Sequence, residues 1–236
     1  MRRPRPSGSF YFCIKKAHLP LFALDKDLYF PPVDLAEHDG LLAIGGDLSP
    51  KRLLLAYREG IFPWYEGEYI LWWCPDPRFV LFPEELRISR TMKSLMKKNV
   101  FDFSFNQNFR EVIRHCKEIR RPGQSGTWIT DQMEAAYIRM HELGYAISGE
   151  AWQNGALVGG VYGVKLGKVF FGESMFAKVS NASKYAFIKL VEHLKAEGVR
   201  LIDCQVYTEH LESLGARMIS RREFREKLRE SIVDSR

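Results

Sequence analysis

The sequence predicts a mixed α/β protein of the α+β class, with a small N-terminal α/β domain and a larger C-terminal domain built on a mixed sheet. Three observations predict this fold. Residues 146–164 have the pattern of an antiparallel β-hairpin, and residues 170–206 have the pattern strand, helix, strand, which requires a parallel crossover. Before them, aromatic, proline-broken segments give way to helical patterns near residue 87. We therefore expect domains at 19–87 and 88–236.

Residues 1–18 are predicted to be a flexible basic extension. Their start resembles the head of a signal peptide, but the apolar stretch after it spans only Phe10 to Ile14, and Lys15 and Lys16 interrupt it. No small-residue cleavage site follows, so we do not expect a secretory signal.

The composition is that of a globular protein, since 46% of the 236 residues are hydrophobic and 13% are aromatic. No run of eighteen apolar residues occurs, so we expect no membrane-spanning helix. Cys13, Cys74, Cys116 and Cys204 show no paired spacing, and no histidines cluster near them. This pattern favours a reduced, cytoplasmic setting and predicts neither a disulfide framework nor a metal site.

A short helix is predicted after residue 49. Ser49 is a favourable cap, Pro50 suits the first helical position, and Gly60 ends the pattern. The preceding Gly45-Gly46 pair lacks the Lys-Ser/Thr of a phosphate-binding loop, so that alternative is disfavoured. Residues 61–65 and 72–78 are predicted to be aromatic, proline-broken loops whose tryptophans fill the core or line a pocket.

Basic residues concentrate between residues 87 and 121, where ten Lys or Arg stand against three acidic residues, a net charge of +7 compared with +6 for the whole chain. We expect one helix capped by Ser89, with Arg90, Lys93 and Lys97 outward. A second carries Arg110, Arg114, Lys117 and Arg121. Each face alone is equally consistent with an ordinary solvated surface. Two such faces close together favour a polyanionic partner, and nucleic acid in particular.

The C-terminal domain is predicted element by element from periodicity and turn residues. A helix through Met133, Tyr137 and Met140 ends at Gly144, and a turn at 153–155 joins the hairpin strands Ala146–Trp152 and Leu157–Val164. Ser180 or Asn181 begins a helix whose apolar stripe precedes Gly198, and a basic helix starts near Arg221.

Two predicted buried strands, Phe170–Phe176 and Leu201–Val206, each carry a carboxylate, Glu173 and Asp203. Strand alternation places Phe171, Glu173 and Met175 on one face, and Asp203 and Gln205 share a face of the second strand. Burying an unpaired carboxylate costs roughly several kcal/mol, so such groups are paired or functional. The pattern predicts a polar site in an apolar pocket, with two satisfied carboxylates of an ordinary βαβ unit as the alternative.

Taken together, these segments resemble the leucyl/phenylalanyl-tRNA–protein transferase family. The similarity runs from about residue 30 to 224. The blocks that carry it are Gly40–Pro50, Gly60–Trp64, Leu71–Arg78, Ile88–Arg90, Gly126–Thr130, Leu157–Gly160, Gly172–Phe176, Asn181–Lys184, Leu201–Val206 and Ser213–Ala216.

The resemblance implies a small N-terminal α/β domain packed on a GNAT-like acyltransferase domain. It also implies transfer of Leu or Phe, and less well Met, from aminoacyl-tRNA to the α-amino group of proteins that begin with Arg or Lys, which marks them for N-end rule degradation. The ester of aminoacyl-tRNA is already activated, so no cofactor and no metal are expected. We further expect a monomer without membrane contact.

The resemblance also assigns roles to residues. Asp203 and Gln205 are the expected catalytic pair, with Asp203 either a base or a positioning group, and Glu173 is expected to bind the cationic acceptor. Trp73 and Trp128 are expected to contact the terminal adenosine. The expected aminoacyl pocket consists of Val161, Phe170, Met175, Phe187, Leu190 and Ile202, although each of these apolar residues is equally consistent with plain core packing. Independently of the resemblance, the charge pattern makes Arg87, Arg90, Lys93, Lys97 and Lys98 the expected phosphate contacts. Val161 and Leu190 replace the Met and Phe usual in the family, which reshapes the pocket and leaves the preferred amino acid open.

Two other functions compete with this one. A CoA-dependent GNAT acetyltransferase needs a glycine-containing turn before its helix to hold pyrophosphate, and the corresponding residues 176–181 contain no glycine. A tRNA-binding module in which the carboxylates only stabilise the sheet predicts tRNA binding without transfer.

Overall fold

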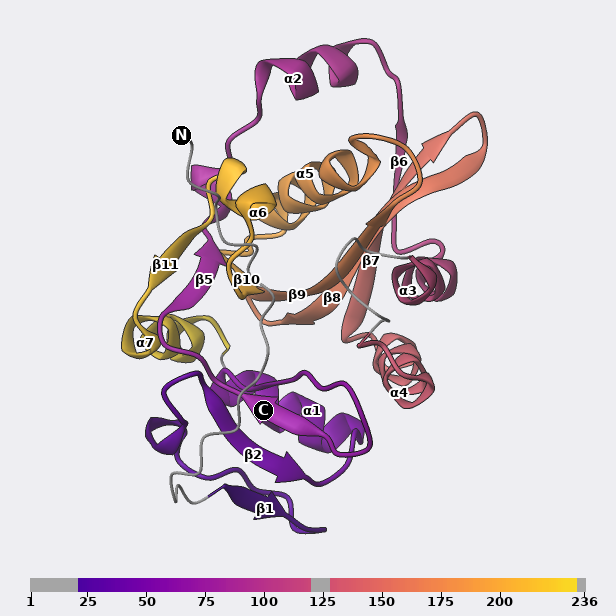
Figure 1. Ribbon diagram of the computed structural model, residues 1–236. Coiled ribbons are helices and arrows are strands. Elements are labelled where there is room, and N and C mark those ends of the chain that lie inside the picture. Colours follow the sequence, from indigo (N-terminus) through magenta and orange to yellow (C-terminus); the bar gives the residue numbers. More distant parts are fainter. Residues whose placement is uncertain (1–20, 120–127, 233–236) are drawn as a thin grey trace, which may run out of the picture.

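Two β-sheets organise the protein in this computed structural model, which describes residues 21–119 and 128–232 (Figure 1). The predicted extension 1–18, Cys13 and Arg121 lie outside the described residues. The two sheets contain parallel and antiparallel pairs, which confirms the predicted mixed α/β class.

The smaller sheet has the order β1-β2-β4-β3, with β1 parallel to β2 and the other pairs antiparallel. Helix α1 (Pro50–Glu59) begins at Ser49, whose side chain accepts a hydrogen bond from the Arg52 N–H, and ends at Gly60 with φ of 79°, as predicted. The strands are β1 (Phe22–Leu24), β2 (Leu41–Gly45), β3 (Phe62–Pro63) and β4 (Leu71–Trp73), and a 3-10 turn, η1, spans Val33–Leu35.

The prediction that residues 61–65 and 72–78 are loops was partly wrong. Phe62 and Pro63 pair with Trp73 and Trp72, and β5 (Arg78–Leu81) begins at Arg78. Proline is tolerated because β3 is an edge strand, where a missing N–H breaks no ladder bond on its open side.

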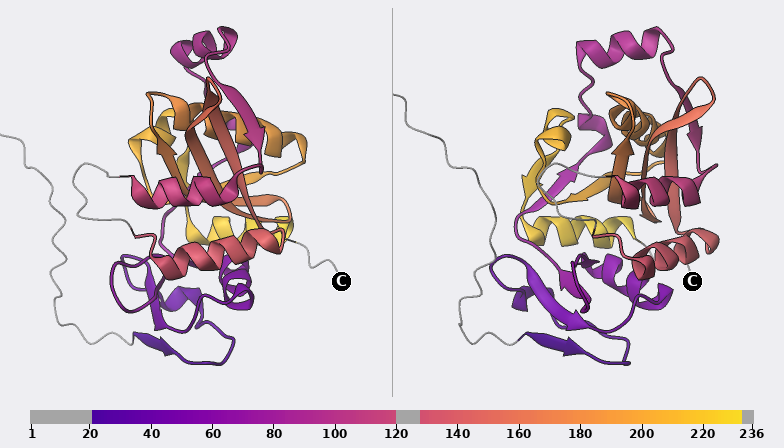
Figure 2. Two further views of the ribbon diagram at one scale, coloured as in Figure 1. Left: turned by 90° about the vertical axis from the view of Figure 1, so that its right-hand side faces the viewer. Right: turned by 45° about the vertical axis from the view of Figure 1, so that its right-hand side comes forward.

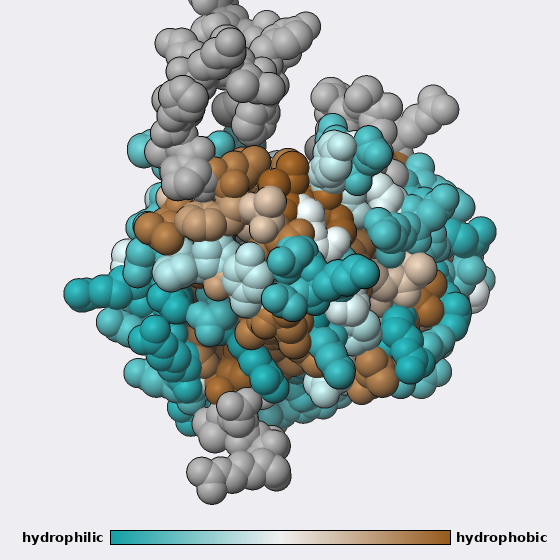
Figure 3. Space-filling model, turned by 90° about the horizontal axis from the view of Figure 1, so that it is seen from below, coloured by the Kyte–Doolittle hydropathy of each residue, from teal (hydrophilic) through white to brown (hydrophobic). Residues whose placement is uncertain are grey.

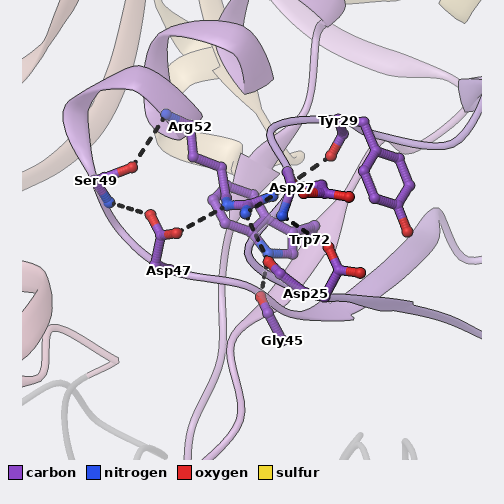
Figure 4. A network of polar contacts seen from close by, with 8 residues as sticks. All are labelled: Asp25, Asp27, Tyr29, Gly45, Asp47, Ser49, Arg52 and Trp72. Carbon is purple, nitrogen blue, oxygen red and sulfur yellow. Dashed lines mark hydrogen bonds and ion pairs between the residues drawn. The ribbon is translucent and has the colours of Figure 1, made fainter.

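A buried arginine fixes the start of α1 (Figure 4). The Arg52 side chain donates to the backbone carbonyls of Asp25 and Asp27, at 2.8 and 3.1 Å, and its Nε lies 3.4 Å from the Asp47 carboxylate. The backbone 25–29 is thereby tied to α1. These contacts hold the start of α1 against the segment that follows β1.

The larger sheet has the order β11-β5-β10-β9-β8-β7-β6. Only β9 and β10 run parallel, and helix α5 (Ala182–Ala196) makes the crossover between them, as predicted. The predicted order of a β-hairpin followed by a parallel crossover, expected for a GNAT-like domain, is confirmed. The other strands are β6 (Asp102–Phe105), β7 (Ala146–Gln153), β8 (Ala156–Leu166), β9 (Val169–Ala177), β10 (Leu201–Gln205) and β11 (Arg217–Ile219).

Helices cover both faces of this sheet (Figures 1 and 2). Helix α5 packs on one face through Phe187 and Leu190, and α3 and α4 lie on the opposite face with Tyr137. Besides α5, the helices are α2 (Arg90–Lys97), α3 (Phe109–Glu118), α4 (Asp131–Glu142), α6 (Glu209–Ser213) and α7 (Arg221–Ser231), and a 3-10 turn, η2, spans Pro83–Glu85. Strand β5 precedes residue 87 but already belongs to the larger sheet. The domain boundary near residue 87 therefore stays a prediction.

Two irregularities shape the centre of the sheet. Pairing of β9 with β10 ends at Phe171 and Asp203, and β9 continues to Ala177 without β10. In β9, Glu173 is the extra residue between two regular pairs with β8, so the residues after it change face. The prediction that Phe171 and Met175 share a face was therefore wrong, because Met175 packs on the α5 side with Val161.

No helix among residues 21–119 and 128–232 is long and apolar enough to cross a membrane. From below, on the side of the smaller sheet, the surface shows separate apolar patches among hydrophilic side chains (Figure 3). Leu21, Leu28 and Leu35, near β1 and η1, are among the exposed large apolar side chains.

Candidate active site

A cavity of about 510 Å³ opens where β9 and β10 separate, and both sheets contribute to its wall. Its volume lies in the range of ligand-binding pockets, about 300–1,000 Å³. Phe62 and Trp64 come from the smaller sheet and its following loop, and the other lining residues come from the larger domain. These are Trp128, Val161, Gly172, Glu173, Ser174, Met175, Ser183, Phe187, Ile202, Asp203, Cys204, Gln205, Val206, Thr208, His210 and Leu211.

Asp203 forms a bidentate ion pair with Arg78 on the neighbouring strand β5. The Arg78 Nε lies 2.8 Å and its Nη2 2.6 Å from the two carboxylate oxygens, and both residues are almost fully buried. The Gln205 N–H donates to the same carboxylate at 2.9 Å. The Asp203 carboxylate is therefore held by three fixed N–H donors rather than standing free in the cavity.

Two aromatic rings enclose the Arg78 guanidinium. The ring centres of Phe62 and Phe224 lie 4.6 and 4.7 Å from its central carbon, so the smaller sheet and α7 both contact it. Burial alone would lower the pKa of Arg78, but the Asp203 carboxylate outweighs burial and the pKa is raised. The guanidinium thus remains charged and holds Asp203 in one orientation.

Glu173 faces two tyrosines from different helices. Tyr57 of α1 lies 2.7 Å from Oε1 of the carboxylate and Tyr137 of α4 lies 2.9 Å from Oε2. The Gln205 side-chain amide donates to Oε1 at 2.9 Å. Burial raises the pKa of Glu173 to about 7, and the nearby Asp203 carboxylate adds to this effect.

Gln205 links the two carboxylates, because its backbone N–H binds Asp203 and its side chain binds Glu173. Its φ is 63°, in the left-handed region that residues with a side chain rarely adopt, and β10 shifts its pairing register at this point. Strained backbone of this kind persists where surrounding contacts impose it and is concentrated at functional sites.

The structure brings four of the six residues of the expected aminoacyl pocket to the cavity wall: Val161, Met175, Phe187 and Ile202. Phe170 and Leu190 are fully buried in the same apolar cluster, behind the lining residues. The wall is therefore apolar on the α5 side and polar around Glu173 and Gln205.

The tryptophans divide between wall and core. Trp128 lines the cavity, as does Trp64, which is 41% exposed. Trp73 lies outside the lining, and its indole N–H donates to the Trp64 carbonyl at 2.6 Å while the two rings are 6.0 Å apart. Trp73 thus supports Trp64 from behind, and of these two rings Trp64 is the one placed to contact a ligand.

The predicted phosphate contacts are spread along the surface near α2, far from the smaller sheet in every view of Figures 1 and 2. Arg87, Arg90, Lys93, Lys97 and Lys98 are all exposed, and none is ion-paired with another described residue.

The second basic helix, α3, differs from this surface because its cations have acidic partners. Arg110 pairs with Glu142, Arg114 with Glu111, and Lys117 with Glu134. Helix α3 ends at Glu118, before the predicted Arg121, so of the two predicted basic helices only α2 has cations without an acidic partner among the described residues.

Sequence reasoning missed Arg78, Tyr57 and Tyr137 as site residues, and it left open whether Trp64 fills the core or lines the pocket. A charged side chain at the start of the apolar strand Arg78–Leu81 was a usable signal for the first. The tyrosines had none, because their spacing is that of ordinary buried helix residues and their partner, Glu173, lies in another part of the chain.

Comparison with known proteins agrees with this geometry. The sequence profile described as leucyl/phenylalanyl-tRNA protein transferase matches residues 80–229, and the profile of that protein's N-terminal domain matches residues 46–76. The chain belongs to this transferase family. The family resemblance inferred from the sequence motifs is thereby confirmed, and the chain is an aminoacyltransferase.

Curated members of the transferase family match most of the chain. The leucyl/phenylalanyl-tRNA–protein transferase of Flavobacterium johnsoniae is 58% identical over 205 residues, covering 86% of this chain and 97% of that protein. The protein of the same name from Syntrophobacter fumaroxidans is 58% identical over 217 residues, covering 92% and 93%. The transferase-family match therefore extends across both sheets.

Proposed function

We propose that this transferase moves Leu or Phe, and less well Met, from aminoacyl-tRNA to the α-amino group of proteins that begin with Arg or Lys. The product would then be a substrate of N-end rule degradation in the cytoplasm. The observation that carries the proposal is one cavity in which an apolar wall adjoins the acidic pair Glu173 and Asp203.

The apolar wall suits the aminoacyl side chain. Val161, Met175, Phe187 and Ile202 bound the space with aliphatic and aromatic groups, so a Leu or Phe side chain is removed from water there. Trp64 and Trp128 offer flat rings at the same cavity, and aromatic rings bind unstacked bases by stacking. The terminal adenosine of tRNA would lie between these rings and the polar groups.

Peptide-bond formation requires a neutral amine and a positioned ester rather than a strong base. The amine attacks the carbonyl carbon, a C–N bond forms, nitrogen loses a proton, and the ribose oxygen leaves and gains one. Because Arg78 and the Gln205 N–H occupy the Asp203 carboxylate, we infer that Asp203 acts by positioning Gln205. The Gln205 amide then orients the reacting amine.

The decisive experiment is transfer of labelled Leu or Phe from charged tRNA to a peptide that begins with Arg, catalysed by the wild-type protein. We expect labelled peptide to accumulate in proportion to enzyme. Binding of tRNA without any labelled peptide would favour the non-catalytic tRNA-binding module instead.

Replacement of Glu173 tests acceptor recognition. At about pH 8, where Glu173 is mostly ionised, we expect Glu173→Gln to raise KM for an Arg-led peptide about 10- to 100-fold, because one charge-assisted hydrogen bond is lost. A citrulline-led peptide, which has the shape of Arg without its charge, is the matched control and should change little. An unaltered preference for Arg over citrulline would remove Glu173 from this role.

Neutralising cations of α2 tests the tRNA surface. We expect Lys93→Gln with Lys97→Gln to weaken tRNA binding about tenfold at low salt, equally for all tRNAs, and to reduce the salt slope by about two. Lys165 and Lys189 are matched controls because Glu197 and Glu192 already pair with them, so their replacement should matter less. Losses that depend on tRNA identity would contradict phosphate contact.

A further inference from the structure

Three oxygen-bearing groups from separate elements meet behind the polar end of the cavity, where Glu173 lines the wall and Tyr57 and Tyr137 are fully buried. The hydroxyl oxygens of Tyr57 and Tyr137 lie 2.5 Å apart. Tyr57 lies 2.7 Å from one Glu173 oxygen, and Tyr137 lies 2.9 Å from the other. The groups therefore form a closed ring of three oxygen–oxygen contacts, assembled from α1, α4 and β9.

Each contact in this ring needs one hydrogen, and the hydrogens can be counted. A phenol carries one hydrogen and an ionised carboxylate carries none. Burial raises the pKa of both tyrosines well above its ordinary value, so both keep their hydrogens, and two are available for three contacts. If both phenols donate to an ionised Glu173, their own oxygens face each other at 2.5 Å without a hydrogen between them.

A protonated Glu173 supplies the missing hydrogen. The carboxylic acid donates to Tyr57, Tyr57 donates to Tyr137, and Tyr137 donates to the second carboxyl oxygen, so every contact is satisfied. The side-chain amide of Gln205 donates to the carboxyl group from outside the ring. The arrangement thus matches a neutral acid better than its anion.

The charged and titratable surroundings of the ring come from several elements. Asp203 on β10 disfavours a second negative charge, and burial acts in the same direction, whereas Arg78 on β5 favours the anion. Hydrogen bonds that Tyr57, Tyr137 and Gln205 donate to an ionised Glu173 also lower its pKa, but burial outweighs them and the pKa is raised to about 7. The other titratable groups near it are Tyr162 of β8, which contacts the Tyr137 ring, and, on the cavity wall, Cys204 of β10 and His210 of α6.

We propose that Tyr57 and Tyr137 are positioning residues that hold Glu173 as a neutral acid in the substrate-free enzyme, and that the cationic acceptor terminus displaces its proton. The carboxyl O–H bond breaks, its electron pair stays on oxygen, the proton passes to water, and the carboxylate pairs with the cation. This step rests on the acceptor role proposed for Glu173. Acceptor recognition therefore strengthens as pH rises through the titration of Glu173.

Infrared difference spectroscopy tests the ring without any transfer reaction. The wild-type spectrum minus that of Glu173→Gln should contain a carboxylic-acid C=O band at about pH 6 that gives way to carboxylate bands by about pH 8. A carboxylate spectrum at about pH 6 would overturn the proposal. Because the free enzyme is measured, this result is independent of whether transfer to Arg-led peptides is observed.

The direction in which the infrared midpoint shifts in tyrosine variants tests the role of Tyr57 and Tyr137. Tyr57→Phe or Tyr137→Phe leaves one phenol and one oxygen–oxygen contact, which that phenol satisfies by donating to the anion, so the infrared midpoint should fall by about one pH unit, a tenfold loss of proton affinity. If the phenols acted only as hydrogen-bond donors to the carboxylate, they would lower the pKa of Glu173 in the wild type. Their removal would then raise the infrared midpoint. A raised or unmoved midpoint refutes their role.

Kinetics supply a second readout. In the wild type, the ratio of kcat/KM for the Arg-led peptide to kcat/KM for the citrulline-led peptide should fall as pH falls, with the same midpoint as the infrared titration. In each tyrosine variant, the midpoint of this kinetic ratio should shift together with the infrared midpoint. Tyr185→Phe is the control, since Tyr185 is also buried but lies on α5 against Phe101. A ratio that stays constant with pH contradicts displacement of the proton by the acceptor. Absence of transfer in the wild type refutes the proposed function and leaves the infrared result to decide the ring.

Discussion

Asp203→Asn should lose about 3–5 kcal/mol of unfolding free energy and slow transfer roughly 100-fold. The substitution leaves the buried Arg78 guanidinium without its counter-charge, and the Nη1 atom of Arg78 already has no hydrogen-bond partner among the described residues. Denaturant unfolding measures the first effect, and transfer of labelled Leu, corrected for the folded fraction, measures the second.

A double variant separates stability from chemistry. Arg78→Met with Asp203→Asn removes both charges, and replacement of a whole buried ion pair by uncharged groups is often neutral for stability. We expect unfolding free energy to recover while transfer stays slow, because the fixed carboxylate behind Gln205 is still missing. Recovery of transfer in the double variant would show that Asp203 matters only for folding.

Phe224→Ala should cost about 3–5 kcal/mol of unfolding free energy, as for other fully buried aromatic side chains. It should also lower transfer about tenfold per folded molecule, because the Arg78 guanidinium loses the ring on one of its faces and Asp203 loses its fixed orientation. Thermal unfolding and transfer, measured well below the midpoint of unfolding, give the two quantities.

Leu228→Ala is the matched control on the same helix. Leu228 is equally buried one turn later and packs in the same core, so its truncation should cost about 2–5 kcal/mol. Leu228 is not one of the two rings that enclose the Arg78 guanidinium, so transfer per folded molecule should be unchanged. Equal losses of transfer in both variants would mean that α7 acts on the site only through general stability.

The parallel crossover and the proximity of Glu173 and Asp203 could be predicted because both follow from local patterns. Strand alternation, the apolar stripe of α5 and Gly198, with φ of 83°, are each encoded within a few neighbouring residues. A right-handed crossover then places the two strands in one sheet. The enzyme class followed from motifs spread over the chain rather than from any single element.

The irregularities and the partners of the carboxylates could not be predicted. One extra residue at Glu173 reverses the face of every residue after it in β9, and nothing in local composition marks that position. Tyr57 and Arg78 reach the carboxylates by tertiary contacts across more than a hundred residues. Trp64 and Trp73 differ little in local pattern, and only the packing of one behind the other distinguishes wall from support.

The position of Phe224 in the chain bears on when the enzyme becomes active during synthesis. Gln205 and both carboxylates precede α7, yet the guanidinium that orients Asp203 is enclosed only once that helix has packed. A nascent chain that has emerged from the ribosome only as far as β10 would therefore have the acidic residues but not their final geometry. Aminoacyl-tRNA would meet a competent catalyst only after α7 has packed against Arg78.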